Sequence, residues 1–542
     1  MNGQYIQFEG TIYNTREVKT KLKELAIPCD DSYESLIIGL YKAYGADMVT
    51  HLDGVFAFSF LDRKRETIYL FRDRVGIRTL YYTMVNGMLV YSSHLDKILA
   101  YPGVKAVLDR EGACELLGLG PGRTPGKTPF KGIFELKPGT YLSYNGRTCQ
   151  TVTYWKLHTC KHEENEQETI LHARKLFEEA MEKQGSQTDA GVLLSGGLDS
   201  SYVAAVHKKQ CEAEQKPLYT YSLDFPDSRT YFSADAFQPE LDRPYVDLMV
   251  KFLGSDHSYV WCTLEEQLSG LIPAMKAHCL PCMADIQTTF DHFCGEVGKE
   301  RTVMLTGECA DEIFGGYPWF HMPELVNREG FPWSSDLSPR LLLLREDVKQ
   351  RLQIEQYVEE QYRESLLEVN CPDWESETEH RLRQKAYLTI QYFMQTLIRR
   401  TDIAATTAGI EARVPFADPK LVEYAYNIPW SLKKKDGVRK YVLRKMASGE
   451  LPEAVYNRPK SPYPKNYDPT YQALLCQKWK EERAGDCPVF ELVDEKVLKE
   501  FMDEKKDFSS PWFGQLMRGP QMLAYLLQIN AWLKEYDVEI RI

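Results

Sequence analysis

One short motif constrains this chain more than any other feature: a Ser/Gly-rich loop between an apolar run and a helical pattern. Residues 191–194 (GVLL) predict a buried β-strand, and residues 202–208 (YVAAVHK) predict a helix. Residues 195–201 (SGGLDSS) join them. A strand, a Gly-rich turn and a helix in this order can bind a phosphate, because the glycines let the backbone approach and the first helical N–H groups point at the anion. The motif therefore predicts a phosphate site in an α/β domain.

The side chains of this loop indicate what accompanies the phosphate. The hydroxyl groups of Ser195, Ser200 and Ser201 can donate hydrogen bonds to it. Since a carboxylate would repel a phosphate, we expect Asp199 to bind a Mg²⁺ ion that accompanies the phosphates. No Lys-Ser/Thr pair follows the glycines, so the loop is not a Walker motif. It resembles the pyrophosphate-binding PP-loop of the ATP pyrophosphatases. The alternative is a β–α turn in which Asp199 caps the helix.

Composition and charge exclude several classes of function. The chain has 542 residues, 43% of them apolar and 27% charged, so two to four domains with ample core are expected. A formal net charge of −12 disfavours nucleic acid and anionic membranes as partners. We find no N-terminal apolar signal and no run that could span a bilayer, which predicts a cytoplasmic protein. The spacing of the thirteen cysteines is not that of a disulfide framework, so free thiols are expected. Cys279 and Cys282 have CxxC spacing and are either plain loop cysteines or a metal or redox site.

Two domains are expected, over residues 1–158 and residues 165–542. The first is β-rich, and Asn86-Gly87 is a strong hairpin signal between two of its strands. Its strands are expected at residues 55–61, 67–72, 80–85 and 88–91. The connector over residues 118–139 contains too many glycine and proline residues to form a helix.

The second domain alternates strands and helices, which predicts a parallel sheet with helices on both faces. Besides the strand before the Ser/Gly loop, strands are expected at residues 218–223, 257–261 and 302–305, and a helix at residues 244–253. From about residue 340 the pattern is mostly helical.

A second motif, residues 305–317 (LTGECADEIFGGY), again follows a strand and should lie at the same edge of the sheet. Clustering Glu308, Asp311 and Glu312 is costly unless a cation or a proton transfer needs them. Asp311 can share the Mg²⁺ with Asp199, and Glu308 can act as a general base on an attacking amine. The alternative is an acidic helix start.

Two later motifs are less specific. Glu411 and Arg413, ahead of Pro415, either orient a polar substrate or form a structural ion pair. Lys440, in the basic stretch of residues 436–444, can reach an α-phosphate and stabilise charge that develops there. The alternative for that stretch is a cationic amphipathic helix.

In this order, the four motifs resemble those of the glutamine-hydrolysing asparagine synthetases, and the match covers nearly the whole chain. The resemblance implies a β-rich remnant of an N-terminal-nucleophile amidotransferase domain, followed by a PP-loop ATP pyrophosphatase domain with a parallel sheet and a helical C-terminal part. It implies ATP and Mg²⁺ as cofactors, with Asp199 and Asp311 as the metal ligands. Glu308 and Lys440 would act on the adenylate intermediate. The remaining site residues would be Ser195, Gly196, Gly197 and Ser200 for pyrophosphate, and Leu194, Leu223, Thr306 and Gly307 for adenosine.

The N-terminal domain matches the family's amidotransferase only from Phe8 onward and departs from it at functional positions. The family starts Met-Cys-Gly and uses that cysteine as the nucleophile, whereas this chain starts Met-Asn-Gly. Glu9 replaces the oxyanion-hole Asn, and Thr11 replaces the substrate-binding Glu. The family's Ser-Asp-x-Glu motif corresponds to residues 31–34 (DSYE). We therefore expect no glutaminase activity.

The resemblance implies an ATP-dependent amide-forming ligase that makes asparagine from aspartate and ammonia through an aspartyl-adenylate, releasing AMP and pyrophosphate. Two alternatives stay open: a β-lactam-synthetase-like or other natural-product amide synthetase, and a non-catalytic ATP-binding paralogue. The ammonia would come from solvent or from a separate glutaminase. A homodimer is a further candidate assembly, and neither nucleic acid nor a membrane is expected as a partner.

Overall fold

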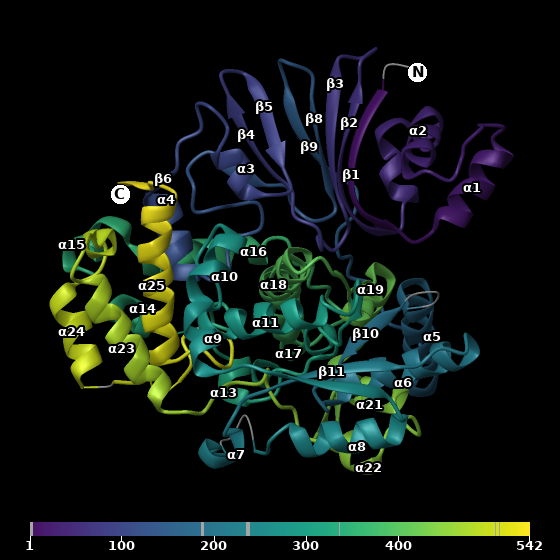
Figure 1. Cartoon of the computed structure of the whole chain (residues 1–542). Coiled ribbons are helices and arrows are strands. Elements are labelled where there is room, and N and C mark those ends of the chain that lie inside the picture. Colours follow the sequence, from purple (N-terminus) through teal and green to yellow (C-terminus); the bar gives the residue numbers. More distant parts are fainter. Residues whose placement is uncertain (1–3, 186–188, 235–238, 335, 505, 509) are drawn as a thin grey trace. The chain divides into compact units, whose positions relative to one another are not determined.

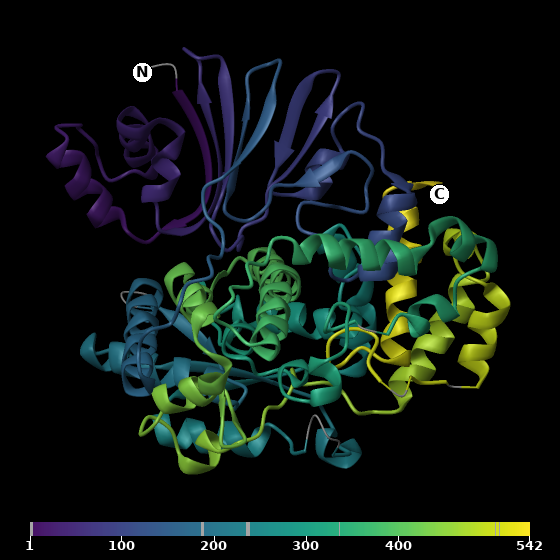
Figure 2. The same ribbon diagram turned by 180° about the vertical axis from the view of Figure 1, so that it is seen from behind.

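The computed structural model of the chain describes residues 4–185, 189–234, 239–334, 336–504, 506–508 and 510–542. The chain forms two compact units, residues 1–106 with 124–158 and residues 107–123 with 159–542. Figures 1 and 2 show the ribbon from opposite sides. Among the described helices, none is both long and apolar enough to cross a membrane.

The first unit contains two antiparallel sheets, with strand orders β1-β2-β3-β8-β9 and β5-β4-β7. The larger consists of β1 (Gln4–Ile12), β2 (Gly54–Asp62), β3 (Thr67–Arg72), β8 (Thr140–Tyr144) and β9 (Cys149–Thr153). The smaller consists of β4 (Tyr81–Val85), β5 (Met88–Ser92) and β7 (Ile133–Glu135). The expected strands are confirmed to within one residue at each end. Asn86 and Gly87 join β4 to β5 with φ of 50° and 78°, as this hairpin turn requires.

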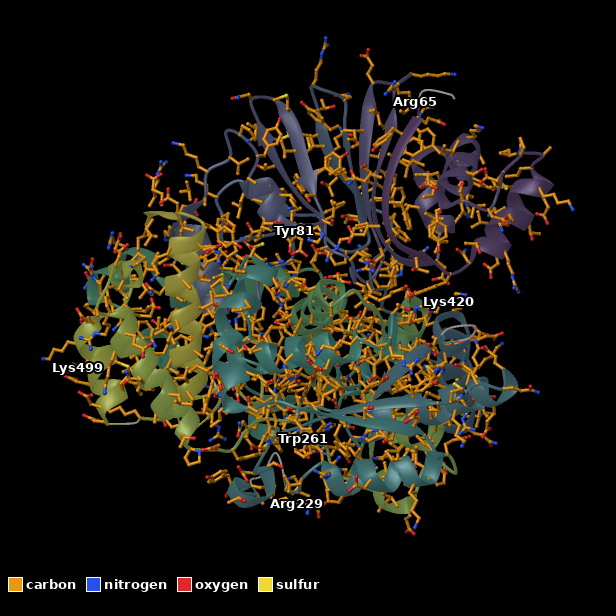
Figure 3. All side chains as sticks on the ribbon, in the orientation of Figure 1. Arg65, Tyr81, Arg229, Trp261, Lys420 and Lys499 are labelled. Carbon is orange, nitrogen blue, oxygen red and sulfur yellow. The ribbon has the colours of Figure 1, made fainter. Side chains whose placement is uncertain are left out.

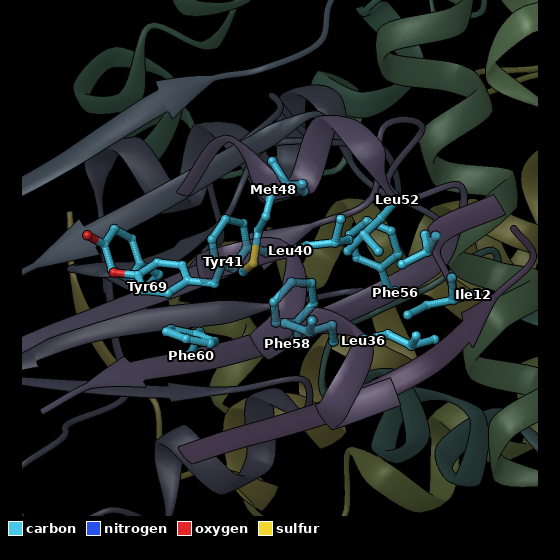
Figure 4. Close-up of a cluster of buried hydrophobic side chains, with 14 of the residues drawn as sticks. Ile12, Leu36, Leu40, Tyr41, Met48, Leu52, Phe56, Phe58, Phe60 and Tyr69 are labelled. Carbon is cyan, nitrogen blue, oxygen red and sulfur yellow. The ribbon is translucent and has the colours of Figure 1, made fainter. Parts of the chain in front are cut away.

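Strand β2 is buried on both faces, and its alternating sequence explains how. Phe56, Phe58 and Phe60 share one face and pack with the buried residues of two helices, as Figure 4 shows. Those helices are α1 (Thr15–Glu24) and α2 (Tyr33–Tyr44). Ala57 points the other way and packs against Leu80 and Leu136, which border the smaller sheet.

Arg72, at the end of β3, forms a buried ion pair with Glu135. Arg72 Nη1 lies 2.8 Å from Glu135 Oε1, and each side chain is only 2% exposed. The guanidinium also donates to the carbonyl oxygens of Gly76, Arg78 and Leu136. Arg72 therefore closes the loop after β3 onto β7.

Residues 107–123 belong to the second unit, whereas the sequence-based division placed all of residues 1–158 in the first. Within this segment β6 (Val107–Asp109) pairs in parallel with β17 (Glu539–Arg541). Tyr525 Oη donates to the Leu116 carbonyl at 2.9 Å. Arg340 Nη1 donates to the Gly120 carbonyl at 2.6 Å. These partners lie far along the chain, so no local pattern indicates the pairing.

The second unit is built on a parallel sheet with strand order β12-β11-β10-β13-β14. Its strands are β10 (Ala190–Leu193), β11 (Tyr219–Asp224), β12 (Asp256–Trp261), β13 (Val303–Leu305) and β14 (Glu411–Arg413). The strands expected from the sequence are confirmed, and β14 is additional. One face packs against α11 (Ala284–Val297) and α18 (Met394–Thr407). Helices α6 (Leu198–Ala213) and α8 (Arg243–Leu253) cover the other face (Figures 1 and 2).

The strand order reverses at β10, which lies between β11 and β13. The loops that follow β10 and β13 therefore emerge side by side at the carboxyl edge of the sheet, which is where open α/β sheets bind ligands. Most of the chain after residue 340 is helical, as expected, and ends with α25 (Gly519–Glu535) and β17.

Arg72→Ala should destabilise the first unit by about 3–5 kcal/mol, because the buried Glu135 carboxylate loses its cation. Hydrogen–deuterium exchange of the full chain measures this: amides of β3 and β8 should exchange faster, while β10 and β11 keep their protection. Arg65→Ala is the control, since Arg65 (labelled in Figure 3) is 67% exposed. Unchanged exchange in β3 would contradict a stabilising role for the pair.

Candidate active site

The Ser/Gly loop turns tightly between β10 and α6. Ser195 Oγ lies 3.0 Å from Ser200 Oγ, and Ser195 N donates to Ser200 Oγ at 3.1 Å. Gly196 has a φ of +67°, and a Cβ there would lie 2.8 Å from Val246 N. Both the left-handed backbone and this close approach require glycine. Gly197 then precedes the first residue of α6.

Arg458 holds this loop from outside the motif. Its Nη1 donates to the Ser195 carbonyl at 3.1 Å, and its Nη2 donates to Asp242. The guanidinium lies 4.1 Å from the centre of the Tyr245 ring, and the Arg458 side chain is 2% exposed. Burial raises the pKa of Asp242, and Arg458 opposes that shift. Sequence reasoning missed this residue, whose only signal is the basic, Pro-punctuated stretch around it.

The second motif packs directly on the first. A Cβ on Gly307 would lie 2.7 Å from Ser200 N and 2.9 Å from the Asp199 carbonyl carbon, so only glycine allows the two loops to touch backbone to backbone. Thr306 N donates to the Arg413 carbonyl at 3.1 Å, which fixes the second loop on β14. The expected adjacency of the two motifs is confirmed.

Lys440 joins the two loops. Its Nζ donates to Asp199 Oδ1 and Oδ2 at 2.8 and 2.6 Å and also contacts Asp311 Oδ1. Lys460 Nζ lies 2.9 Å from Asp311 Oδ2. Lys440 is buried and directly precedes helix α21 (Tyr441–Met446). Three of the four motifs thus meet at one ammonium group, and Lys460 is a neighbour that the sequence did not indicate.

The charges of this cluster follow from burial and pairing. Burial raises the pKa of Asp199, which has only Lys440 as an ion-pair partner among the described residues. Burial would also raise the pKa of Asp311, but Lys440 and Lys460 outweigh it and hold the value at about 2. Burial alone would lower the pKa of Lys440, but the two carboxylates raise it above its ordinary value. Lys440 is therefore a permanent cation.

Glu308 is held by α18 rather than left free. Arg400 Nη2 donates to Glu308 Oε1 at 2.6 Å, and Thr401 Oγ1 donates to Oε2. The Arg400 guanidinium lies 4.7 Å from the Phe290 ring centre and 5.0 Å from that of Tyr463. These two hydrogen bonds thus hold the carboxylate in a defined position. Arg400 carries no local sequence signal, because its partner lies 92 positions away.

A single cavity joins these groups. The predicted site residues line it, with the exceptions of Gly196, Ser201, Glu411 and Arg413, together with Arg400, Arg458 and Lys460. Ser201 is fully buried. Its hydroxyl therefore does not reach the cavity, and the prediction that it donates to the phosphate is wrong. Glu411 and Arg413 pair on β14 at 3.1 Å, which is the structural alternative considered for them.

Asp199 and Asp311 fit a divalent cation. Both carboxylates reach the same Lys440 Nζ, so both can reach one ion placed beside it. Carboxylate oxygens are the ligands that Mg²⁺ prefers. Cys279 and Cys282 are buried, and Cys282 Sγ lies 3.3 Å from Gln528 Nε2, which supports plain structural cysteines.

In the first unit, the residues that replace family positions lie on β1. Glu9 pairs with Ala57 and Thr11 with Val55 in the register of β1 with β2. Ser32 caps helix α2, since its Oγ accepts from Ser35 N at 3.2 Å. Residues 1–3, which include the expected nucleophile position, lie outside the described residues. The loss of glutaminase activity stays a prediction.

Comparison with known proteins gives the family. A family model described as asparagine synthase matches residues 172–534, and one described as a glutamine amidotransferase domain matches residues 1–155. The chain belongs to the asparagine synthetase family. As a member of this family it is an amide-forming carbon–nitrogen ligase of the asparagine synthetase type, and the resemblance drawn from its motifs is confirmed.

Relatives support this family along the whole chain. Asparagine synthetase [glutamine-hydrolyzing] 3 of Bacillus subtilis is 38% identical over 540 residues, which cover 99% of this chain and 88% of that protein. Asparagine synthetase [glutamine-hydrolyzing] 1 of the same organism is 25% identical, over 85% of this chain and 75% of that protein. Amidase chyE of Penicillium rubens is 26% identical, over 79% of this chain and 72% of that protein.

Glu312 makes the stability of this family member depend on pH. Tyr317 Oη donates to Glu312 Oε1 at 2.6 Å, and the Glu312 side chain lies buried beside Asp311. Burial, followed by the Asp311 charge, raises the pKa of Glu312 from 4.5 to about 7. The unfolded chain therefore releases this proton first, and stability falls as the pH rises through that window.

Glu312→Gln should remove this loss, which amounts to about 3 kcal/mol above the folded pKa. Glutamine still accepts the Tyr317 hydrogen bond. Thermal unfolding should therefore show a higher midpoint than the wild type at about pH 8 and no gain at about pH 4.5. Glu324→Gln, on an exposed side chain, is the control. An equal shift at both pH values would show that titration of Glu312 is not the cause.

Proposed function

We propose that the second unit activates the side-chain carboxylate of aspartate with ATP and transfers it to ammonia, forming asparagine. The carboxylate oxygen attacks the α-phosphorus, and pyrophosphate leaves. Ammonia then attacks the carbonyl carbon of the aspartyl-adenylate, and AMP leaves. The observation that carries this proposal is the meeting of Asp199, Asp311 and Lys440 beside the Ser/Gly loop, at the reversal of the strand order.

The loop and its neighbours would bind the nucleotide. Ser195 and Ser200 offer hydroxyl groups and Gly196 and Gly197 offer close backbone approach, beside the positive end of helix α6. Leu194, Leu223, Thr306 and Gly307 would contact adenosine. Lys440 would stabilise the charge that develops on the α-phosphate during attack, in a site where burial strengthens the interaction.

Asp199 and Asp311 would hold Mg²⁺. Bound there, the ion would neutralise part of the charge of the phosphates. Lys440 and Lys460 keep the carboxylates paired in its absence, so the two acids do not repel each other.

Glu308 would serve the attacking amine. An ammonia molecule that attacks the acyl-adenylate must lose a proton, and a fixed carboxylate can accept a hydrogen bond from one of its N–H groups and take up that proton. Arg400 and Thr401 would act as positioning residues, because each bonds one oxygen of Glu308. Held by these two residues, the Glu308 carboxylate can orient the nucleophile and stabilise the positive charge that develops on its nitrogen.

Free ammonia, or ammonia from a separate glutaminase, would be the nitrogen donor. Glu9 stands where the family has the oxyanion-hole Asn, and an anion there opposes the charge that glutamine hydrolysis develops. Cytoplasmic localisation and dimerisation stay predictions.

A second candidate is a larger carboxylate substrate, as in the natural-product amide synthetases. Met283, Ile286, Phe290 and Phe293 line the same cavity from α11 and its start. An apolar wall favours a carboxylate with a hydrophobic body.

Pyrophosphate release tests the proposal directly. With Mg-ATP and aspartate, the purified chain should release pyrophosphate and form asparagine with ammonium but not with glutamine. Asparagine formation with glutamine would contradict the predicted loss of glutaminase activity. Release with an apolar carboxylate, but not with aspartate, would favour the second candidate. Nucleotide binding without release on any carboxylate would identify a non-catalytic paralogue.

Glu308→Gln should separate the two half-reactions. Loss of the proton acceptor should lower amide formation by about 10²-fold or more. Adenylation, measured as aspartate-dependent exchange of pyrophosphate into ATP, should fall less than about tenfold, since the Lys440 cluster is untouched. Glu296→Gln, an acid on α11 whose partner is the exposed Lys299, is the control. Equal losses in both assays would show that Glu308 has no specific role in the attack of the amine.

A further inference from the structure

Cys262, Glu266 and His292 form a cluster that the proposed reaction does not use. One potential ligand atom of each lies within 4.8 Å of those of the other two. Cys262 directly follows Trp261, the last residue of β12, which is labelled in Figure 3. Glu266 lies on α9 (Leu264–Ser269) and His292 on α11. The cluster thus joins three elements, and none of its members lines the cavity of the candidate active site.

Hydrogen bonds already fix the orientation of two of these side chains and leave one potential ligand atom of each outside these contacts. His292 Nε2 donates to the Trp261 carbonyl at 2.9 Å, which leaves the lone pair on Nδ1. Metal-binding histidines commonly donate their other ring N–H to a carbonyl in this way. Glu266 Oε2 accepts from the N and Oγ1 of Thr263, each at 2.8 Å, and this leaves Oε1 for another partner. The third member, Cys262, is fully buried.

A second cavity gives access to the cluster. Glu266 and His292 line it, and so does Asp291. Asp291 Oδ1 accepts from Gln287 Nε2 at 2.6 Å, whereas its Oδ2 is buried and has no hydrogen-bond partner among the described residues. To the cavity that Glu266 and His292 also line, Asp291 thus adds a buried carboxyl oxygen that has no hydrogen-bond partner in the described part of the chain.

We propose that Cys262 Sγ, Glu266 Oε1 and His292 Nδ1 bind a divalent transition metal of the zinc class, with water as the fourth ligand. One sulfur, one nitrogen and one oxygen donor suit zinc, whereas Mg²⁺ and Ca²⁺ prefer oxygen ligands alone. The Cys262 thiol gives its proton to solvent as the metal–sulfur bond forms. The ion ties the end of β12 to α11, the helix that brings Phe290 and Phe293 to the active-site cavity. Its role is therefore to stabilise the fold.

Cobalt titration of the full chain tests the site, with excess Mg²⁺ present to occupy sites made of oxygen ligands. We expect one equivalent of Co²⁺ to bind with a thiolate-to-cobalt charge-transfer absorption, and Zn²⁺ to displace it and raise the unfolding midpoint. Binding without the charge-transfer absorption, or no binding, would overturn the proposal.

Variants assign the ligands. Cys262→Ser should abolish the charge-transfer absorption. Glu266→Gln should weaken zinc binding by about tenfold or more and yet keep the helix cap, because Gln also serves at that position. Glu265→Gln, its exposed neighbour, and Cys211→Ser, a buried thiol on α6, are the matched controls and should bind as the wild type does. If Cys262→Ser does not fold, the Glu266→Gln variant tests the assignment instead. Zinc affinity equal to that of the wild type in Glu266→Gln would overturn it.

Discussion

The ammonium group of Lys440 is the interaction on which the candidate active site depends. It contacts Asp199 on the first loop and Asp311 on the second, and so joins three segments that are distant in the sequence. Two buried carboxylates this close would otherwise repel each other, and one would take up a proton. The lysine keeps the cluster charged and compact, and Lys460 adds a second cation on Asp311. Nucleotide binding and loop geometry therefore rest on the same charges.

Close backbone approach is the second constraint. Gly307 lets the second loop touch the start of α6, and a Cβ on Gly316 would collide with Asp311 Oδ1 and Lys440 Cε. Gly196 allows the first loop to pass against α8. Glycine at these positions thus brings the charged side chains within ion-pair distance, because any larger residue would separate the segments that carry them.

Much of this arrangement could be predicted from local sequence, because its signals are local. The strand–loop–helix around Ser195, the hairpin at Asn86 and the central strands of the parallel sheet each follow from a short pattern. The edge strand β14 has only three residues, and its partner is β13, so no alternation reveals it. Within residues 107–123, β6 pairs with β17 at the far end of the chain. Arg400 and Arg458 act on Glu308 and Ser195 across long sequence separations, and only the fold brings them together.

Burial and ion pairing give the neighbouring carboxylates of the second motif different pKa values and different roles. Asp311 and Glu312 are adjacent in the sequence and both buried. Two lysines hold the pKa of Asp311 at about 2, whereas burial beside that charge raises the pKa of Glu312 to about 7. Glu308 has its own cation in Arg400. The motif therefore supplies a permanent anion suited to a metal, a titrating acid and a positioned acceptor within five residues, because each carboxylate has different partners.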